Sequence, residues 1–446
     1  MALRPPSGYR TSAANAAIEV TGFLGYRCHR CGREYPPADV FYTCPDDGAN
    51  LDVRIDIDRI RSTSSPQAIA ASPEPSIWRY LPLLPVGTPG HVGTPLWAVG
   101  WTPLFTPRRL AAKLGLRRLW MKDDGRNPTA SFKDRASAVV VARAQEIGAG
   151  TVVTASTGNA GAALAGMAAA AGQPAVILAP RTAPPAKVAQ LLIFGATVLL
   201  VEGTYDQAFD LTIEAAAALG WYCRNTGYNP FTAEGKKTAA FEICEQLTGF
   251  VGARHAVPLQ WIAPDVVFVS VGDGNIISGL HKGFRDLHDL GWISRVPRLV
   301  GIQAAGSAAV YQAFASGASE IAPVRAETIA DSISVDLPRD GLRALRAVRE
   351  SGGTLLTVDD RAILTAIAEL GKVEAIFAEP AAATAYAGLA EAVRLGQVDP
   401  EERVVVMLTG SGLKDVRAAM QAAGEATVIE PSLAALQRAL TSGRTA

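Results

Sequence analysis

The sequence predicts an α/β protein with two three-layer α/β domains, mainly parallel sheets, a cleft between the domains and a small N-terminal zinc-ribbon-like segment. From residue 101 onward, short apolar runs alternate with longer alanine-rich segments, a pattern typical of parallel strands covered by helices on both faces. With 446 residues, of which 49% are hydrophobic, the chain is too long for one such sheet. Closely spaced cysteines near residue 30 indicate the additional small segment.

Composition limits the classes of partner. The 42 basic side chains balance 42 acidic ones without a long basic run, so we expect neither nucleic-acid binding nor membrane attachment. No apolar run reaches the roughly 18 residues of a membrane span, and the N-terminus lacks the charged-then-apolar pattern of a signal peptide. An odd number of cysteines, five, makes a disulfide framework unfavourable. We therefore expect a cytoplasmic protein.

The individual elements follow from the lengths of the apolar runs. Residues 1–20 are expected to form an arm. Strands are expected at 119–122, 151–155, 175–179, 197–201, 265–271, 298–303 and 404–409. Helices are expected at 131–147, 160–171, 187–194, 205–219, 235–247 and 360–370.

These elements divide the chain into five expected parts. They are a zinc-ribbon-like segment over 1–62, a linker and arm joining the large domain over 63–107, a smaller α/β domain over 108–235, a larger α/β domain over 236–428, and a C-terminal helix or tail over 429–446.

One lysine stands between a turn and the start of an apolar helical run. It is Lys133, in the stretch NPTASFKDR at 127–135. Most lysines are solvated, but a partly desolvated lysine at a helix start in a cleft can form a Schiff base with an aldehyde cofactor. For the neighbouring Asp134 and Arg135, a structural salt link or helix cap is favoured over catalysis.

A second segment, TASTGNAG at 154–161, joins an expected strand to an alanine-rich helix. Such a turn presents backbone N–H groups and small side chains to an anion or a ring. Ser156, Thr157 and Gly158 are candidates for binding a substrate carboxylate, and Asn159 for donating to a phenolic oxygen. An ordinary helix N-cap is the alternative.

A third segment, VSVGDGNIISG at 269–279, again joins a strand to a helix. Its glycines allow the close backbone approach that cradles a phosphate without a lysine. A dinucleotide is the alternative ligand, but the spacing is not G-x-G-x-x-G and the next strand lacks a terminal acidic residue. The candidate phosphate-binding residues are Gly272, Asp273, Gly274, Asn275 and Ile276.

A fourth segment, MLTGSGLKD at 407–415, also follows an expected strand. Thr409 is a candidate hydrogen-bond partner for a pyridine nitrogen, and a neutral hydroxyl would keep that nitrogen less protonated than a carboxylate would. A strand-ending turn with a helix cap is the alternative interpretation.

Together and in this order, the four segments resemble the tryptophan-synthase-like fold (fold type II) of pyridoxal phosphate enzymes, and most closely its threonine synthase members. The resemblance covers roughly residues 78–425 and includes the further stretches WTPL at 101–104, NP at 229–230, EGKKT at 234–238 and EPA at 379–381. It implies pyridoxal 5'-phosphate as cofactor and a homodimer.

The resemblance also implies a role for each matched residue. Lys133 would hold the cofactor as a Schiff base and move protons, Asn159 would bind its phenolic oxygen, and Thr409 its pyridine nitrogen. The cofactor phosphate would lie on residues 272–276, and the substrate carboxylate on Ser156 and Thr157.

In the stretch that binds the substrate phosphate in this family, two residues depart from the family pattern. Threonine synthases carry a serine and a phosphate-clamping arginine in the stretch that here reads TGYNPFT, where Gly227 and Thr232 stand instead. The candidates for a replacement charge are Arg181, Lys187, Lys236 and Lys237.

The favoured function is a carbon–oxygen lyase that converts the small amino acid O-phosphohomoserine, with water, to threonine and phosphate. Two alternatives remain open. One is a serine/threonine dehydratase-type β-elimination, or a β/γ-replacement on another O-activated amino acid. The other is a non-catalytic paralogue that binds the cofactor.

The N-terminal cysteines predict a metal site. Cys28 and Cys31, followed by Cys44, have the spacing of a zinc ribbon in which Asp47 takes the place of the fourth cysteine. Three thiolates and a carboxylate can bind structural zinc. The alternative is a degraded ribbon that folds on its own apolar core of Phe23, Tyr35 and Phe41.

Overall fold

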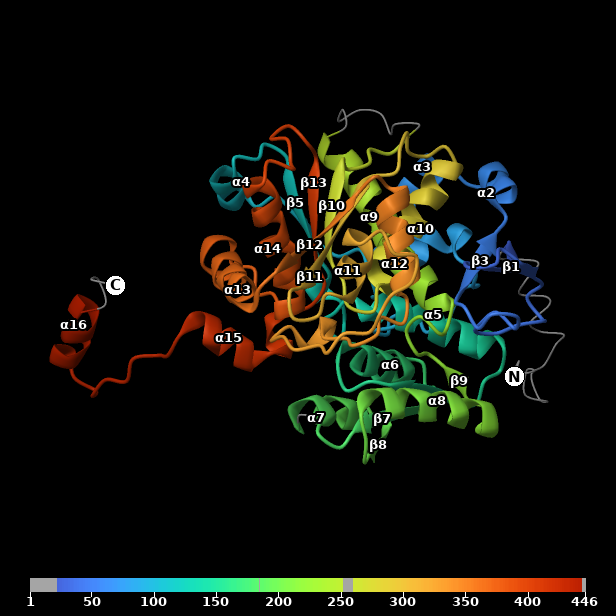
Figure 1. The fold of residues 1–446 in the computed structure, drawn as a ribbon, viewed down its shortest axis with the longest axis horizontal. Coiled ribbons are helices and arrows are strands. Elements are labelled where there is room, and N and C mark those ends of the chain that lie inside the picture. Colours follow the sequence, from blue (N-terminus) through green and yellow to red (C-terminus); the bar gives the residue numbers. More distant parts are fainter. Residues whose placement is uncertain (1–21, 184, 252–259, 443–446) are drawn as a thin grey trace.

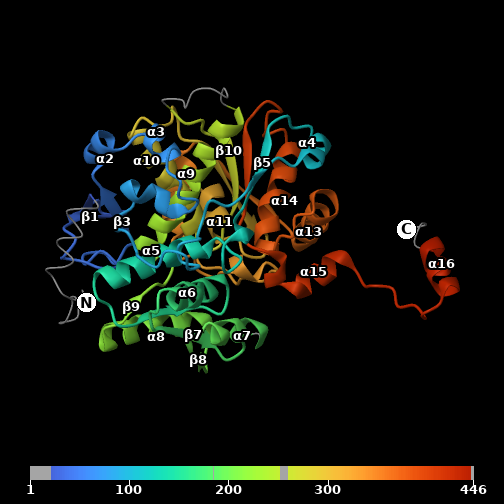
Figure 2. The same cartoon turned by 180° about the vertical axis from the view of Figure 1, so that it is seen from behind.

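The computed structural model describes residues 22–183, 185–251 and 260–442. The expected N-terminal arm at 1–20 lies outside these residues. The described chain forms three sheets, in the order β2-β1-β3, β12-β11-β10-β13-β5-β4 and β8-β7-β6-β9 (Figures 1 and 2). None of the described helices has the length and apolar character needed to cross a bilayer.

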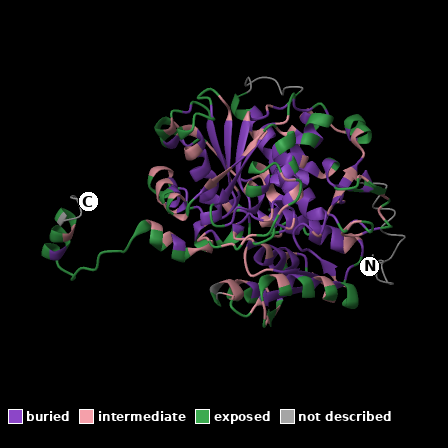
Figure 3. Cartoon of the chain, viewed as in Figure 1, coloured by how far each residue is buried: buried purple, intermediate pink, exposed green. Residues whose placement is uncertain are grey.

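The larger sheet carries the centre of the molecule. From one edge to the other, its strands are β12 (Thr354–Val358), β11 (Arg298–Ala304), β10 (Val266–Ser270), β13 (Val404–Leu408), β5 (Leu119–Asp123) and β4 (Leu104–Phe105). All neighbours are parallel except β4, which pairs antiparallel with β5. Every residue of β10 and β13 is buried, as expected of strands covered on both faces (Figure 3).

Side chains alternate between two apolar cores along these central strands. Val267 and Val405 pack into one core with residues of α5, α9 and α10, whereas Phe268 and Val406 pack into the other with α13 and α14. The helices that cover the sheet are α4 (Arg108–Leu114), α9 (Phe231–Val251), α10 (Asn275–Asp289), α11 (Ala309–Ala315), α12 (Gly341–Glu350), α13 (Asp360–Glu374) and α14 (Pro380–Arg394).

The smaller sheet is wholly parallel. It contains β8 (Thr197–Val201), β7 (Ala175–Pro180), β6 (Val152–Ala155) and β9 (Tyr222–Cys223), with helices α6 (Asn159–Ala170), α7 (Pro185–Ile193) and α8 (Tyr205–Leu219) around it. Helix α5 (Lys133–Glu146) contacts α6 on one side and α9 on the other, so it joins the two layered bodies (Figure 1). A Cβ at Gly235 would overlap the carbonyl oxygen of Arg135, so glycine permits the close crossing of α5 and α9.

The N-terminal strands form a small antiparallel sheet against the main body. They are β1 (Phe23–Cys28), β2 (Glu34–Tyr35) and β3 (Leu51–Ile55), followed by α2 (Ile57–Thr63) and α3 (Pro66–Ala70). The Phe23 ring meets Phe231 of α9 edge-on, with centroids 5.5 Å apart. This segment therefore shares the main core, and of the three aromatic residues expected in a core of its own, Tyr35 and Phe41 are only half-buried.

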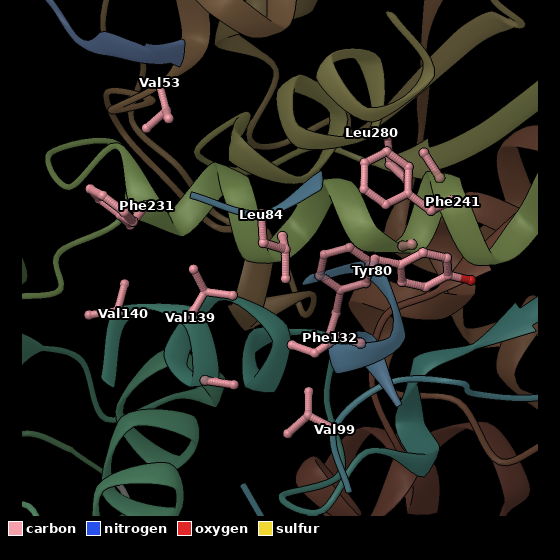
Figure 4. Packing of buried hydrophobic residues seen from close by; sticks show 14 of the residues in the cluster. Val53, Tyr80, Leu84, Val99, Phe132, Val139, Val140, Phe231, Phe241 and Leu280 are labelled. Carbon is pink, nitrogen blue, oxygen red and sulfur yellow. The ribbon is translucent and has the colours of Figure 1, made fainter. Parts of the chain in front are cut away.

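The segment expected as a linker and arm is ordered on the large body. The 3₁₀ turn Ile77–Leu83 buries Tyr80 against Phe241 of α9, with ring centroids 5.4 Å apart, and Figure 4 shows Tyr80, Phe132 and Phe241 in this packing. The remaining elements are three short 3₁₀ turns (Asp124–Arg126, Asp331–Ile333 and Gly412–Lys414), helix α15 (Val416–Ala423) and helix α16 (Leu433–Ser442), which lies apart from the body in Figures 1 and 2.

The elements at the start of the expected smaller domain belong instead to the larger body, where α4 contacts α13. The sequence assigns residues 119–122 to the smaller domain, but β5 pairs with β13 and β4 in the larger sheet. The parallel partner of a strand can lie hundreds of residues away, as Val404 does from Leu119, so local pattern alone does not identify it.

Candidate active site

A cavity of about 430 Å³ opens where the smaller and larger bodies meet. The ends of β6 and β10 and the starts of α5, α6 and α10 supply much of its lining, the position expected for a ligand in sheets of this type. It contains Lys133, all of Ser156–Asn159 and all of Gly272–Ile276. Three of the four segments singled out in the sequence therefore converge on one cavity.

Lys133 is the first residue of α5 and its position is fixed by the strand end beside it. The backbone N–H of Phe132 donates to the carbonyl oxygen of Thr409, at 2.9 Å, and Ala130 turns the chain with a φ of 64°. Burial, and next the positive charge of Arg224, lower the pKa of Lys133, while Glu379 and Asp273 partly oppose this. A lowered pKa makes the neutral, nucleophilic amine more available.

The turn after β6 presents its small side chains to the cavity. Gly158 is the N-cap of α6, and its N–H donates to Ser156 Oγ at 3.1 Å. Asn159 Nδ2 donates to both carboxylate oxygens of Glu379, at 2.9 and 3.0 Å. Burial raises the pKa of Glu379, and the hydrogen bond from Asn159 partly offsets the rise. A second, smaller cavity of about 100 Å³ shares Asn159 with the first and includes Glu379 and Lys187.

The glycine-rich turn after β10 is held from two sides. Gly274 has a φ of +91°, and a Cβ there would lie 2.8 Å from the Asp340 carbonyl oxygen. Asn275 begins α10; its Nδ2 donates to Asp340 Oδ2 at 2.7 Å, and its Oδ1 accepts from Lys236 Nζ. The turn therefore offers a braced backbone at the N-terminal end of a 15-residue helix, which favours an anion.

Thr409 lies beside this arrangement but outside the cavity lining. It is buried directly after β13, and its carbonyl oxygen accepts from the residue before Lys133. Among the described residues that line the cavity, Thr409 does not occur.

Arg224 is a cavity residue that the sequence did not single out. It is fully buried; its Nε donates to Ser137 Oγ at 3.2 Å and its Nη1 to Thr226 Oγ1 at 2.7 Å. Its Nη2 has no hydrogen-bond partner among the described residues. Burial lowers the pKa of Arg224 to about 10. The preceding strand, β9, spans only two residues, too few for a recognisable pattern, although Arg224 stands two residues before the start of the stretch TGYNPFT.

The four cations considered as replacement charges have different surroundings. Lys236 lines the main cavity, and burial, followed by the charges of Lys133 and Arg224, holds its pKa well below the usual value. Lys237 is paired with Glu234 and Asp286, at 2.6 and 2.8 Å. Lys187 pairs with Asp331 beside the smaller cavity, and Arg181 with Glu202 at the exposed surface.

The two departures from the family pattern have structural reasons. Gly227 has a φ of +79°, and a Cβ there would lie 2.8 Å from the carbonyl oxygen of Arg339, so a serine would be strained. Thr232 is fully buried, and its hydroxyl lies 2.7 Å from the Asn229 carbonyl oxygen and 3.2 Å from Asn275 Oδ1. Thr232 therefore braces the glycine-rich turn.

The residues at the cavity fit a phosphorylated aldehyde cofactor. The amine of Lys133 is desolvated, the turn at 272–276 provides an anion cradle, and Arg224 Nη2 and Ser270 Oγ are buried without partners among the described residues. Buried polar atoms of this kind normally have a partner. The flanking Asp134 and Arg135 are structural, as expected: Asp134 accepts the N–H of Thr129, at 2.6 Å, and Arg135 forms buried ion pairs with Asp124 and Glu242, each at 2.6 Å.

Comparison with known proteins agrees with this geometry. Residues 97–410 match the family described as pyridoxal-phosphate dependent enzyme. The threonine synthase of Methanocaldococcus jannaschii is 38% identical over 416 residues, which cover 93% of this chain and 98% of that protein. The threonine synthase of Methanosarcina acetivorans is 38% identical over 417 residues, with the same coverage.

Solved structures agree in fold. The processed form of threonine deaminase isoform 2 from Solanum lycopersicum superposes with a TM-score of 0.61 at 20% identity, over 78% of this chain and 92% of that one. The resemblance seen in the sequence, the fold class and the pyridoxal phosphate cofactor are thereby confirmed. The chain belongs to the pyridoxal-phosphate dependent enzymes and, within them, to the threonine synthase family of lyases.

Proposed function

We propose that this protein converts O-phosphohomoserine and water to threonine and phosphate. The observation that carries the proposal is the buried, partly unpartnered guanidinium of Arg224 in the cavity that also holds Lys133. The names of relatives that match over 93% of the chain support the same reaction.

We assign the cofactor contacts to residues of the cavity and to Thr409 beside it. Pyridoxal phosphate, bound through Lys133, supplies an electron sink for the negative charge that develops on the substrate. Residues 272–276 hold its phosphate at the start of α10, Asn159 donates to its phenolic oxygen, and Thr409 contacts its pyridine nitrogen.

Lys133 is the residue we assign to proton transfer. Because burial and Arg224 lower its pKa, its amine is available to take the α-proton of the substrate at a lower pH than an ordinary lysine would be. The same amine then takes the β-proton, the Cγ–O bond breaks, and phosphate leaves with that proton. Water adds its hydroxyl at Cβ and its proton at Cγ, and Lys133 returns the α-proton to Cα. Ser156, Thr157 and Gly158, at the start of α6, would hold the substrate carboxylate throughout.

We assign the two phosphate groups to different cations. Lys236 already donates to Asn275 of the glycine-rich turn, so it serves the cofactor phosphate there. Arg224 has a free Nη2 and a fixed orientation, so it serves the phosphate of the substrate and replaces the arginine that the family carries at position 232.

An Arg224→Gln variant tests this assignment. The KM for O-phosphohomoserine should rise about 10- to 100-fold, since a charge-assisted hydrogen bond to phosphate contributes about 1.5–3 kcal/mol, while the visible absorption of the bound cofactor remains. Arg181→Gln is the matched control, because Arg181 is exposed and pairs with Glu202. An unchanged KM in Arg224→Gln would refute the assignment.

Product analysis distinguishes this reaction from its alternatives. We expect phosphate and threonine from O-phosphohomoserine, without 2-oxobutyrate from threonine. If 2-oxobutyrate forms from threonine instead, the chain is a dehydratase and Arg224 holds the cofactor. Binding of the cofactor without either product would favour replacement on another O-activated amino acid, or a paralogue without activity.

We also propose a homodimer in a reducing compartment such as the cytoplasm. Helix α16 stands off the body at the end of an extended segment, and its Leu433 and Leu440 are 69% and 64% exposed, which suits a contact with a second copy (Figures 1 and 2). All five cysteines are free thiols, which suits a reducing compartment.

A further inference from the structure

The N-terminal sheet brings together four metal-binding side chains outside the active site. One ligand atom from each of Cys28, Cys31, Cys44 and Asp47 lies within 4.8 Å of the others. The Sγ atoms of Cys31 and Cys44 are 3.8 Å apart, and bonds of about 2.3 Å to a tetrahedral zinc ion place two sulfurs about 3.8 Å apart. A disulfide would need about 2.05 Å.

Hydrogen bonds from neighbouring groups hold the ligand atoms in place. Cys28 Sγ accepts the backbone N–H groups of Arg30 and Cys31, both at 3.4 Å, and Tyr35 lies with its hydroxyl 3.0 Å from Cys44 Sγ. Asp47 accepts the N–H of Ala49 at 2.9 Å, which orients its carboxylate. Hydrogen bonds of this kind hold the ligands of a metal site in place.

The same loop reaches the catalytic body through one side chain. Asn50 lies three residues after Asp47, and its Nδ2 donates to Asp340 Oδ1 and to the carbonyl oxygen of Arg339, both at 2.8 Å. The other carboxylate oxygen of Asp340 accepts from Asn275 at 2.7 Å, and Asn275 is the last residue but one of the glycine-rich turn. Two hydrogen bonds therefore connect the cysteine loop to the cofactor phosphate cradle.

Two further contacts join the N-terminal segment to helix α12 of the larger body. Asp52 of β3 forms an ion pair with Arg343, at 2.6 Å, and Arg346 donates to the carbonyl oxygen of His29 at 2.6 Å. Both arginines belong to α12, whose N-cap is Asp340. The loop that carries Asn50 thus packs on the helix that presents Asp340.

We propose that Cys28, Cys31, Cys44 and Asp47 bind one structural zinc ion, and that this ion fixes the loop from which Asn50 braces the cofactor phosphate cradle through Asp340 and Asn275. Without the metal, the loop of residues 44–50 loses its cross-link, and Asp340, which supports the cradle, loses the hydrogen bond from Asn50 that orients it. The proposal extends the role of the N-terminal segment beyond folding, to the retention of the cofactor.

Metal analysis of the full-length holoenzyme is the first test. We expect one zinc ion per chain, its loss in Cys31→Ser and Cys44→Ser, and no disulfide by mass spectrometry after thiol labelling. A disulfide between Cys31 and Cys44, or no binding of added Zn²⁺ by the reduced protein, would overturn the metal site.

Cofactor affinity separates the bracing role from the metal site. Asn50→Ala should keep its zinc yet bind pyridoxal phosphate about 5- to 10-fold more weakly, because one hydrogen bond to a buried carboxylate is lost. Glu34→Gln, which removes only an ion pair between Arg54 and Glu34 within the small sheet, is the matched control. Unchanged cofactor affinity in Asn50→Ala would overturn the bracing role.

A reversible experiment avoids variants that fail to fold. Chelation of the wild-type enzyme should weaken cofactor binding to the same degree as Asn50→Ala, and added Zn²⁺ should restore it. Chelation should cause little further loss in Asn50→Ala, since both changes act on the same support. If chelation weakens cofactor binding as much in Asn50→Ala as in the wild type, the metal does not act through Asn50. Because the readout is cofactor affinity, its outcome does not depend on which substrate the enzyme takes.

Discussion

At the scale of single residues, the state of Lys133 depends on charges that come from distant parts of the chain. Its pKa is lowered by burial and then by Arg224, whose guanidinium lies on the strand end after β9. A folded-state pKa below the usual value keeps the amine neutral at lower pH, so cofactor attachment should speed up as pH rises through that lowered pKa.

Removal of the Arg224 charge should shift this pH dependence. In Arg224→Gln the pKa of Lys133 should rise, so the pH at which apoenzyme regains its visible absorption at half-maximal rate should move upward. Rates measured by stopped flow across pH 6–10 would detect the shift. Arg181→Gln should leave the profile in place, and an unshifted profile in Arg224→Gln would contradict the coupling.

The buried ion pairs of Arg135 make a second prediction at this scale. Arg135 pairs with Asp124 and Glu242, and all three side chains are fully buried. Arg135→Met should leave the buried Asp124 without a cation and Glu242 with Lys122 alone. It should lower stability by about 3–5 kcal/mol, seen as a lower urea midpoint. Arg117→Met, in an exposed pair with Glu401, should change the midpoint little.

The ion pairs of Glu242 with Arg135 and Lys122 predict how stability falls at acid pH. Burial would raise the pKa of Glu242, but the charges of Arg135 and Lys122 outweigh it and lower the pKa from 4.5 to about 2. Because the folded pKa lies below the unfolded value, this stabilisation is complete above pH 4.5 and is lost as pH falls toward 2. Urea midpoints measured across that window should fall more steeply for wild type than for Glu242→Gln.

At the scale of elements, the crossing of α5 and α9 determines where Lys133 sits. Gly235→Ala would place a Cβ against the Arg135 carbonyl oxygen, push α5 away and weaken both stability and cofactor binding. Gly249→Ala is the control in the same helix, because nothing lies within 4 Å of its added Cβ. It should stabilise by up to about 1 kcal/mol through helix propensity. Thermal melts with and without cofactor would compare them, and equal behaviour would contradict the crossing argument.

Sequence patterns located the helices and strands better than they indicated which strands pair with one another. The strands β6, β7, β8, β10, β11 and β13 and the helix α8 lie where apolar runs predict them. The strand β12 and the helix α14 escaped prediction: β12 is only partly buried, and α14 is rich in alanine without a distinctive polar face. Strand β5 was found but assigned to the smaller sheet, since its pairing with β13 is set by the tertiary fold.

The site was also only partly predictable, because local patterns reveal turns but not contacts between distant residues. Lys133, Ser156–Asn159 and Gly272–Ile276 stand at strand-to-helix turns, which local sequence reveals, and the structure brings them to one cavity. Arg224 and Asp340 act through contacts across 87 and 65 residues of chain, to Ser137 and to Asn275. Nothing in their own neighbourhoods shows these contacts. The roles of the individual residues stay predictions that the variants above test.

At the scale of the whole molecule, α16 provides the test of assembly. Removal of residues 426–446 should convert the proposed dimer to a monomer in light scattering, because it removes the exposed leucines of α16 that we expect to contact the second copy. Leu433→Asp with Leu440→Asp should act likewise, whereas Gln437→Glu, at an exposed polar position of the same helix, should not. A truncated chain that stays dimeric would place the interface elsewhere.

The broader division of the chain at 62, 107, 235 and 428 also stays a proposal. The segment after residue 62 packs Tyr80 against Phe241, so we expect limited proteolysis to spare 63–107 and to cut first between α15 and α16, where residues 425–430 are exposed.

The hydrogen bonds of Thr232 restrict how a chain of this kind can evolve. An arginine at 232 would enter a fully buried position beside the cation of Lys236 and would break the support of Asn275. A mutant that gained the family's usual clamp in one step would therefore lose its cofactor before it gained a substrate contact. The proposed clamp at Arg224 and a clamp at position 232 would then be alternatives that a single substitution at 232 cannot exchange without loss of the support of Asn275.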